Sequence, residues 1–243
     1  MVRSSPRPVL NELLTALPAG DMQRLRAELE PVVLKLGEVI FESGDELDFV
    51  YFPTSGIISL LQIMANGSTG EIAVVGNEGV VGIALFMGGE SSPSRAVVQS
   101  AASALRLPAK ALTKEFKRGG ELQRLLLRYT QALIAQMSQT VVCNRHHSIQ
   151  QQLSRWLLMS LDRLESNDVL MTQELIANML GVRREGVTDA AGALQGKKLI
   201  RYARGRIEVL DRLGLERVAC ECYRVVKAET DRLFHPRAAA PGA

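Results

Sequence analysis

The feature that most restricts the fold is a long segment without helix-breaking residues. From residue 121 to about 144 the chain has no glycine or proline, and side chains suited to one helix face recur at steps of three and four, at Leu122, Leu126, Tyr129, Leu133, Met137 and Thr140. This spacing predicts an amphipathic helix of about 24 residues and about 36 Å. That is longer than a small β-domain needs to cover itself. We therefore expect a dimer seam along this helix, with packing onto its own domain as the alternative.

The residues before this helix have the pattern of many short strands. Apolar runs rich in β-branched and aromatic residues occupy 32–34, 39–41, 49–52, 57–61, 72–75, 96–98 and 104–107. Turn residues separate them, including Gly37, Ser43-Gly44-Asp45, Pro53-Thr54-Ser55-Gly56 and Asn66-Gly67-Ser68. Such spacing predicts an antiparallel, jelly-roll-like β-roll.

Helical patterns flank the β-roll and the long helix. Residues 9–29 carry apolar positions that suit two short amphipathic helices, broken at Pro18-Ala19-Gly20: Leu10, Leu13, Leu14, Leu17, Met22, Leu25 and Leu29. A second long pattern, 149–164, places Leu153, Trp156, Leu157 and Leu161 on one face. A third block at 166–213 and a terminal helix through Phe234 follow. The predicted fold class is therefore α+β.

Composition excludes several classes of protein. With 47% hydrophobic and 23% charged residues in 243, the chain has enough apolar surface to fold and is not largely disordered. No apolar run approaches the roughly 18–20 residues of a membrane span, and the basic start, 1–8, lacks the apolar stretch of a signal peptide. Three cysteines cannot all pair. We expect a cytoplasmic protein with no membrane partner.

The most informative block, 172–194, has the pattern of two helices joined by a tight turn. Thr172 can cap the first helix, whose predicted buried face is Leu175, Ile176 and Met179 or Leu180. Gly181 can end it in the left-handed conformation that glycine adopts at little cost. The second helix then has an inward face of Val187, Ala190, Ala191 and Leu194 and an outward face that begins with Arg183, Arg184, Glu185 and Thr188. This is the pattern of a DNA-binding helix-turn-helix.

The next segment, 199–210, predicts a β-hairpin that turns at Arg204-Gly205, as in the wing of a winged helix. Between residues 181 and 206 there are seven basic residues (183, 184, 197, 198, 201, 204, 206) and two acidic ones (185, 189), a balance of +5. The whole chain carries only +3, so the remainder sums to −2. Basic charge concentrated on one small surface indicates phosphate binding. The candidate DNA-binding residues are Thr172, Arg183, Arg184, Glu185, Thr188, Lys197, Arg201 and Arg206.

Along nearly its whole length the chain resembles the Crp/Fnr superfamily of bacterial transcription regulators. The run 181–188 is similar to that family's recognition-helix signature, in which an Arg-Glu pair meets base edges, here Arg184 and Glu185. Asp189 departs from the pattern, where the best-known members have a basic residue. The resemblance implies a cyclic-nucleotide-binding-like sensor domain at 1–118, a dimerisation helix at 119–148 and a winged helix-turn-helix domain with a C-terminal helix at 149–243. It also implies a homodimer on double-stranded DNA, and RNA polymerase as a partner if the protein is an activator.

The effector pocket departs further from that family. Its cyclic-nucleotide binders carry a Gly-Glu-x-Gly cassette followed by an Arg-Ser or Arg-Thr pair, and the matching residues here are Gly79 to Gly82 and Arg95. Val80 stands where a glutamate would accept the ribose hydroxyl bond. Gly79, Gly82 and Arg95 are the candidate effector residues, for an effector that is absent or not bound like cyclic AMP. The alternative is a regulator or binding module responsive to a cyclic nucleotide or cyclic dinucleotide.

Other reactive side chains do not form a recognisable set in the sequence. Cys143, Cys220 and Cys222 are too few for a four-cysteine cluster, and on a predicted helix Cys220 and Cys222 would face about 200° apart, so we interpret all three as structural. His146 and His147 are interpreted as polar residues at a helix junction, with metal or haem ligation as the alternative. No catalytic triad, P-loop or dinucleotide-binding pattern is present. We expect no catalytic residue, no cofactor and no metal.

Overall fold

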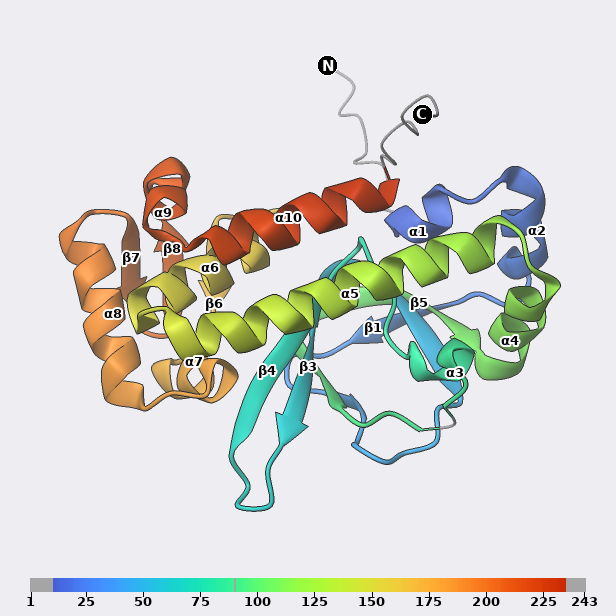
Figure 1. Ribbon diagram of the computed structural model, residues 1–243, viewed down its shortest axis with the longest axis horizontal. Helices are drawn as coiled ribbons and strands as arrows, with labels where there is room; N and C mark the ends of the chain where they lie inside the picture. Colours follow the sequence, from blue (N-terminus) through green and yellow to red (C-terminus); the bar gives the residue numbers. More distant parts are fainter. Residues whose placement is uncertain (1–10, 90, 235–243) are drawn as a thin grey trace, which may run out of the picture.

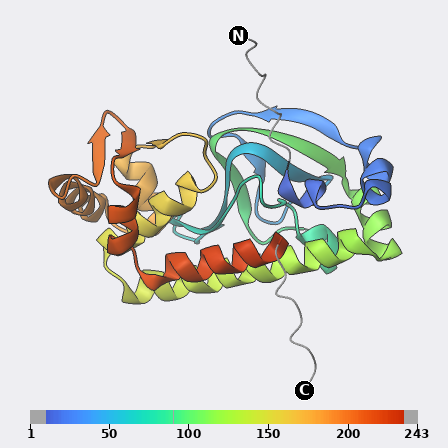
Figure 2. The same cartoon turned by 90° about the horizontal axis from the view of Figure 1, so that it is seen from above.

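The computed structural model describes residues 11–89 and 91–234. These residues form a β-rich lobe and a smaller helical lobe, joined along one side by two long helices, α5 (Glu121–His146) and α10 (Glu221–Phe234) (Figure 1). Viewed from above, α10 lies beside α5 (Figure 2), and the two helices are in contact. The α+β class predicted from the sequence is confirmed.

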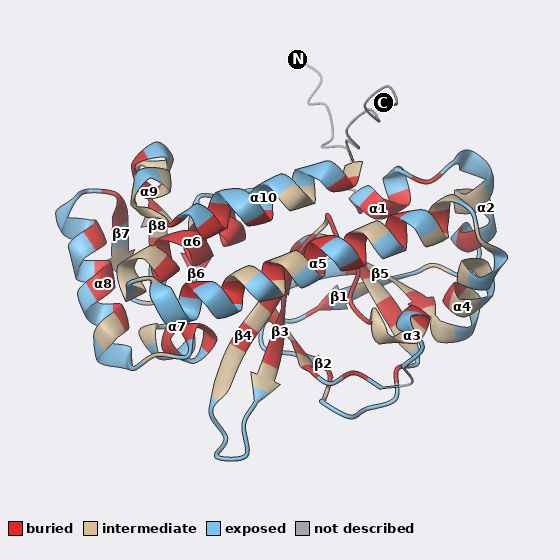
Figure 3. Ribbon diagram, in the orientation of Figure 1, coloured by how far each residue is buried: buried red, intermediate tan, exposed pale blue. Residues whose placement is uncertain are grey.

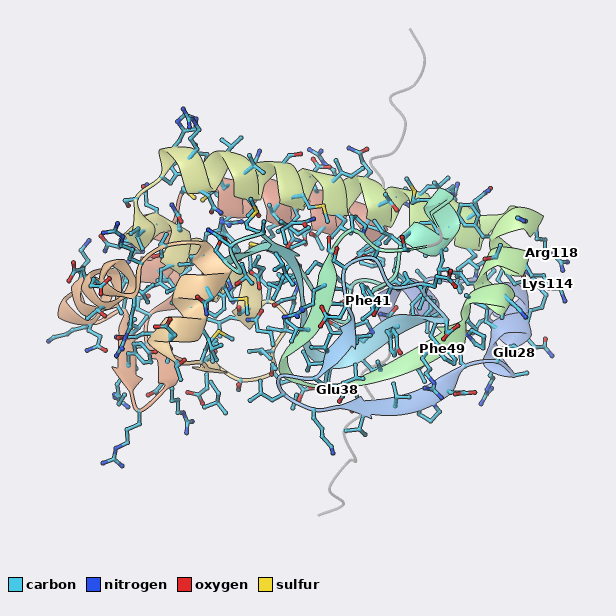
Figure 4. The ribbon with its side chains drawn as sticks, turned by 90° about the horizontal axis from the view of Figure 1, so that it is seen from below. Glu28, Glu38, Phe41, Phe49, Lys114 and Arg118 are labelled. Carbon is cyan, nitrogen blue, oxygen red and sulfur yellow. The ribbon has the colours of Figure 1, made fainter. Side chains whose placement is uncertain are left out.

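The β-rich lobe is built on one antiparallel sheet. The strands β1 (Glu30–Leu34), β5 (Arg95–Pro108), β3 (Phe49–Ile63) and β4 (Thr69–Val75) follow in that order, and β2 (Val39–Phe41) also pairs with β5. Across the described residues the sheet does not close into a barrel. Phe41 is buried in the core, whereas Phe49 lies toward α4 with its ring facing the Arg106 guanidinium at 4.3 Å (Figure 4). The short helices α1 (Glu12–Thr15), α2 (Ala19–Arg26), α3 (Ala84–Met87) and α4 (Ala109–Arg118) complete this lobe.

Three expected boundaries in this lobe are wrong. The runs 49–52 and 57–61 belong to one strand, β3, and the residues 53–56 form irregularities in its pairing with β5 instead of a turn. Gly56 permits this because its φ is +74° and a Cβ there would lie 2.4 Å from the Ala101 carbonyl oxygen. The runs 96–98 and 104–107 are likewise one strand, β5. At the N-terminus, Ala19 and Gly20 begin α2 instead of breaking it, and Leu10 lies outside the described residues.

The predicted long helix is confirmed, but the apolar face that we assigned to a dimer seam is buried against the rest of the same chain. Leu122, Leu126, Tyr129, Leu133 and Thr140 are all buried, and most of these side chains belong to the core of the β-rich lobe. That face is therefore not the uncovered seam that we expected from the sequence. Figure 3 shows buried and exposed bands alternating along α5. Other apolar side chains of the helix remain exposed, as described below.

The smaller lobe begins with α6 (Ile149–Leu161), which ends three residues earlier than predicted. It continues through β6 (Asp168–Leu170), α7 (Gln173–Leu180), α8 (Arg184–Gly196), β7 (Ile200–Ala203), β8 (Arg206–Val209) and α9 (Arg212–Val218). The three strands form a sheet of order β6-β8-β7. Ile57, Leu61 and Val74 of the β-rich lobe share one hydrophobic core with this lobe, so the two lobes are packed together.

Buried polar side chains cross the same boundary, and we call them the inter-lobe cluster: Ser59, Glu71, Gln99, Trp156 and Ser160. Trp156 Nε1 donates to Glu71 Oε1 at 3.0 Å, and Gln99 Nε2 donates to Ser160 Oγ at 3.4 Å. Ser59 Oγ lies 2.6 Å from Glu71 Oε2 and 2.7 Å from Gln99 Oε1. These contacts tie the sheet to α6. Within the described residues, no helix is long and apolar enough to cross a membrane.

Candidate DNA-binding interface and effector loop

The turn between α7 and α8 has the geometry that the sequence predicts. Thr172 caps α7, its side chain accepting a hydrogen bond from the Leu175 amide at 3.3 Å. Gly181 ends the helix with φ +66° and ψ +34°, and its amide donates to the Ala177 carbonyl, as does the Val182 amide at 3.0 Å. A left-handed residue at this position turns the chain sharply while satisfying a free helix carbonyl.

One of the residues predicted to lie on the buried face of α7 is exposed. Ile176, Met179 and Leu180 are buried, whereas the Leu175 side chain is 46% exposed. The spacing of three and four residues from Ile176 defines one stripe, and Leu175 lies one residue before it. Leu175 is therefore an exposed apolar side chain on the helix that precedes α8.

The second helix, α8, is held by its small and apolar face. Val187, Ala190, Ala191 and Leu194 are buried, as expected. Gly186 lies against Ile149 of α6, where a Cβ would come within 2.5 Å of the Ile149 side chain. The glycine leaves room for the end of the Ile149 side chain, which would have to shift if residue 186 carried a Cβ.

The other face of α8 is open to solvent. Arg183 is the N-cap residue, and Arg183, Arg184, Glu185 and Thr188 are all exposed. Thr188 Oγ1 lies 2.9 Å from Gln173 Oε1, which links this face to α7. The structure thus places the predicted base-contacting residues together at the start of α8.

The predicted wing is confirmed as a hairpin of β7 and β8. Arg204 (φ 51°) and Gly205 (φ 76°) form its two-residue turn, and two positive φ values are typical of a type I′ hairpin. Arg204 lines the same groove as Arg184, a space of about 460 Å³ between the wing and the starts of α7 and α8. The candidate set from the sequence omitted Arg204, although its place at the hairpin turn could have indicated it.

Ion pairs distinguish the cations of this surface. Arg206 pairs with Asp168, with Nε 3.0 Å from Oδ1, and the guanidinium holds the pKa of that carboxyl below its usual value. Arg201 pairs with Glu208 at 2.7 Å. Within the described part of the chain, Lys197 and Arg204 form no ion pair. Lys197 and Arg204 could therefore bind a phosphate group without breaking an existing ion pair.

The candidate effector loop is closely packed. A Cβ on Gly79 would lie 2.6 Å from the Tyr129 side chain of α5, and Val80 is fully buried in the core. Gly82 has a φ of +104° and lies close to Val50. Burial raises the pKa of the Tyr129 hydroxyl well above its usual value. The long helix therefore packs directly on the segment where a nucleotide would be held in the family that the sequence resembles.

The third candidate effector residue, Arg95, has its own partner. Its Nε and Nη2 atoms donate to the two carboxylate oxygens of Glu42 at 2.6 and 2.8 Å. This fork-like pairing occupies two of the guanidinium donors. An anionic ligand would have to compete with Glu42 for Arg95.

Comparisons with known proteins agree with this geometry. Residues 31–118 match the family model of the cyclic nucleotide-binding domain, and residues 151–218 match that of the Crp-like helix-turn-helix domain. A Crp/Fnr-family structure from Eubacterium rectale has a TM-score of 0.68 at 17% identity, covering 85% of this chain and 96% of that one. The chain belongs to the Crp/Fnr superfamily of transcription regulators.

Similar sequences are named as regulators rather than enzymes. The global nitrogen regulator of Synechococcus elongatus is 24% identical over 215 residues, covering 84% of this chain and 96% of the relative. The global nitrogen regulator of a Nostoc species is 26% identical over 191 residues, covering 74% and 85%. As a member of the Crp/Fnr superfamily of transcription regulators, this protein is a DNA-binding regulator and not an enzyme.

The cysteines lie in a different arrangement from the one expected. Cys220 follows the C-cap residue of α9 and precedes α10, so it does not share a helix with Cys222. The argument that the two thiols face apart on one helix is therefore wrong. Cys143, Cys220 and Cys222 form a buried cluster of their own, and His147 lies beside it. The chain folds back along α5 to bring these residues together, which no local sequence pattern could indicate.

Proposed function

We propose that this Crp/Fnr regulator binds an inverted-repeat operator as a homodimer, with α8 in the major groove. The observation that carries the proposal is the exposure of Arg184 and Glu185 at the start of α8, beside a basic wing. Residues at the N-terminal end of a recognition helix are those that reach base edges. A twofold dimer requires two half-sites about one helical turn, roughly 10 bp, apart.

The side chains of this surface suit two kinds of DNA contact. Arg184 can bind guanine through two hydrogen bonds, and Glu185 can accept one from the cytosine amino group. Arg183 and Thr188 flank them on the exposed face, with Thr172 at the start of α7. Lys197, Arg201 and Arg206 are assigned to phosphate contacts, and the groove position of Arg204 adds it to that group.

A second copy of the chain is the proposed partner along α5. Leu127, Ile134 and Val141 are 47%, 48% and 67% exposed, and they recur at intervals of seven residues. A seven-residue repeat of apolar side chains is typical of a coiled-coil seam. This exposed stripe, and not the buried face named from the sequence, supports the dimer.

For the sensor we propose that cyclic AMP is not bound in the usual way. Val80 is buried in the core, Tyr129 packs on Gly79, and Arg95 is paired with Glu42. The proposed division remains a sensor domain at 1–118, a dimerisation helix at 119–148 and a DNA-binding domain at 149–243. A bacterial regulator of this kind would act in the cytoplasm, with RNA polymerase as its partner if it activates transcription.

Selection of bound sequences from a random DNA pool, followed by titration of single variants, tests the DNA proposal. Arg184→Ala should weaken binding to the selected operator by about 1–3 kcal/mol and change binding to random DNA little. Lys197→Ala should weaken both alike and lower the salt slope by about one. Arg206→Ala should also weaken binding to both DNAs, but by less, because Arg206 is already paired with Asp168.

The matched control is Arg217→Ala, an exposed arginine on α9 outside the proposed contact set. It should alter neither specificity nor the salt slope. Equal weakening of operator and random DNA by Arg184→Ala would show that Arg184 contacts phosphate and that the orientation assigned to α8 is wrong.

A further inference from the structure

Four side chains with metal-binding atoms meet where the end of α5 reaches the junction of α9 and α10. The ligand atoms of Cys143, His147, Cys220 and Cys222 all lie within 4.8 Å of one another. Cys143 Sγ is 3.5 Å from Cys220 Sγ, and Cys222 Sγ is 3.6 Å from His147 Nδ1. All three cysteines are free thiols and at most 4% exposed.

These distances agree with those of a tetrahedral metal site. With Zn–S bonds of about 2.3 Å and Zn–N bonds of about 2.0 Å, neighbouring ligand atoms lie about 3.5–3.8 Å apart. Three thiolates and one imidazole are a common ligand set for structural Zn²⁺. We propose that Cys143, His147, Cys220 and Cys222 bind one Zn²⁺ ion that joins the end of α5 to the start of α10.

The backbone brings the ligands together in two pairs. Cys143 and His147 are four residues apart at the C-terminal end of α5, and the His147 amide donates to the Cys143 carbonyl at 3.0 Å. This spacing places both side chains on one helix face. Cys220 immediately precedes α10 and Cys222 lies in its first turn, which brings the second pair of thiols together.

The histidine has the second contact that metal-bound imidazoles usually make. With Nδ1 directed at the thiols, His147 Nε2 lies 3.3 Å from Glu221 Oε1. A carboxylate that accepts the other ring N–H fixes the tautomer and orients the metal-binding nitrogen. Glu221 is thus a positioning residue that would act through His147.

Charge around the cluster also suits a metal–thiolate centre. Zn²⁺ with three thiolates and a neutral imidazole carries a net charge of −1. Arg155 is 4% exposed and lies near enough to interact electrostatically with Cys143 and Glu71, and among the described residues it forms no ion pair. Its Nη1 donates to Thr140 Oγ1 at 3.2 Å, and its Nε has no hydrogen-bond partner. An anionic centre nearby would offset the cost of burying this cation.

The ion would have a structural consequence. The four ligands would complete a tetrahedron and leave no position open for substrate, which is the arrangement of structural zinc sites. The site would clamp α5, which carries the proposed dimer stripe, to the last helix of the smaller lobe. A change at either helix would then be transmitted to the other through the metal.

Metal content and spectroscopy of the full chain test the proposal. The untagged, reduced protein should contain one zinc per chain by elemental analysis. Replacement by Co²⁺ should produce thiolate-to-cobalt charge-transfer bands and the strong d–d bands of tetrahedral cobalt. Cys220→Ser and Cys222→Ser together should lower zinc content from one per chain to near zero.

Conservative variants separate metal binding from folding. His147→Cys keeps four ligands and should retain one zinc, with a shift of the cobalt spectrum toward that of four thiolates. Glu221→Gln should keep the stoichiometry at saturating zinc but weaken zinc affinity about 10–100-fold. The control is His146→Ala, because His146 is exposed and outside the cluster; it should change neither value.

Three results with the wild-type chain would overturn the proposal. They are a reduced wild-type chain that takes up no zinc when supplied with it, a cobalt spectrum without thiolate bands, and a Cys143–Cys220 disulfide in protein prepared without oxygen. Unchanged zinc content in the double serine variant would equally exclude this site. If that variant does not fold, the cobalt spectrum of the wild-type chain decides.

Discussion

The inter-lobe cluster predicts that stability falls as pH rises from about 4.5 to about 7. Ser59 has one hydroxyl proton, yet its oxygen lies within hydrogen-bond distance of both Glu71 Oε2 and Gln99 Oε1. Two acceptors cannot share one proton. If Glu71 is protonated it donates to Ser59, which then donates to Gln99, and every contact is satisfied.

Burial supports the neutral form. It raises the pKa of Glu71 from 4.5 to about 7, against the opposing effects of the Ser59 hydrogen bond, the Trp156 indole and the Arg155 and Arg163 guanidinium groups. One pKa unit corresponds to about 1.4 kcal/mol, so this rise corresponds to about 3 kcal/mol. Between pH 4.5 and 7 the unfolded chain loses this proton while the folded chain keeps it. Stability therefore decreases with pH over that window and is constant above it.

Glu71→Gln tests this reasoning because glutamine imitates the neutral acid. At pH 5 the variant should be within about 1 kcal/mol of wild type, since its amide can still donate to Ser59 and accept from Trp156. At pH 8 it should be more stable than wild type by about 3 kcal/mol. Urea denaturation across this range measures both values.

The control is Glu28→Gln, at an exposed carboxylate on the far side of the β-rich lobe (Figure 4). This variant removes one carboxylate without touching the inter-lobe cluster, so it should not reproduce the gain of about 3 kcal/mol at pH 8. If Glu71→Gln is destabilising by the same amount at pH 5 and pH 8, Glu71 is charged in the folded protein and the proton assignment is wrong.

Three further outcomes are expected. Ile134→Glu should convert the dimer to monomer in sedimentation at micromolar concentration, whereas Val33→Glu, at a 79% exposed position on β1, should not; dimers of both variants would exclude the α5 stripe. Calorimetric titration with cyclic AMP should show no micromolar binding that strengthens DNA affinity, and such binding would refute the role given to Val80. Gly181→Ala should lower the free energy of unfolding by about 1 kcal/mol, because φ is +66° there with open space around it; a neutral effect would mean that the turn relaxes.

Much of the architecture follows from local sequence pattern. The period of three and four residues predicts α5, and the Gly181 turn with small residues after it predicts α7 and α8. The Arg204-Gly205 hairpin follows from turn chemistry alone. These elements are predictable because each is specified by interactions within a few residues of itself.

Contacts between distant segments were decided by the tertiary structure. Which face of α5 is uncovered depends on α10, which packs beside it and is distant in sequence, so the exposed stripe at Leu127, Ile134 and Val141 could not be assigned from periodicity. The long strand β3 depends on pairing with β5, which overrides its turn-like residues 53–56.

The sequence alone thus indicated the family, the order of the main elements and the exposed residues at the start of α8. Only the tertiary structure decided the ion pairs of Arg95 and Arg206. The same is true of the protonation of Glu71 and of the contact between Cys143 and Cys220. The physical reason is distance along the chain. Helix periodicity and turn chemistry depend on residues close together in the sequence. Ion pairs, buried hydrogen bonds and thiol clusters need side chains from distant segments, which only the packed core brings within a few ångströms.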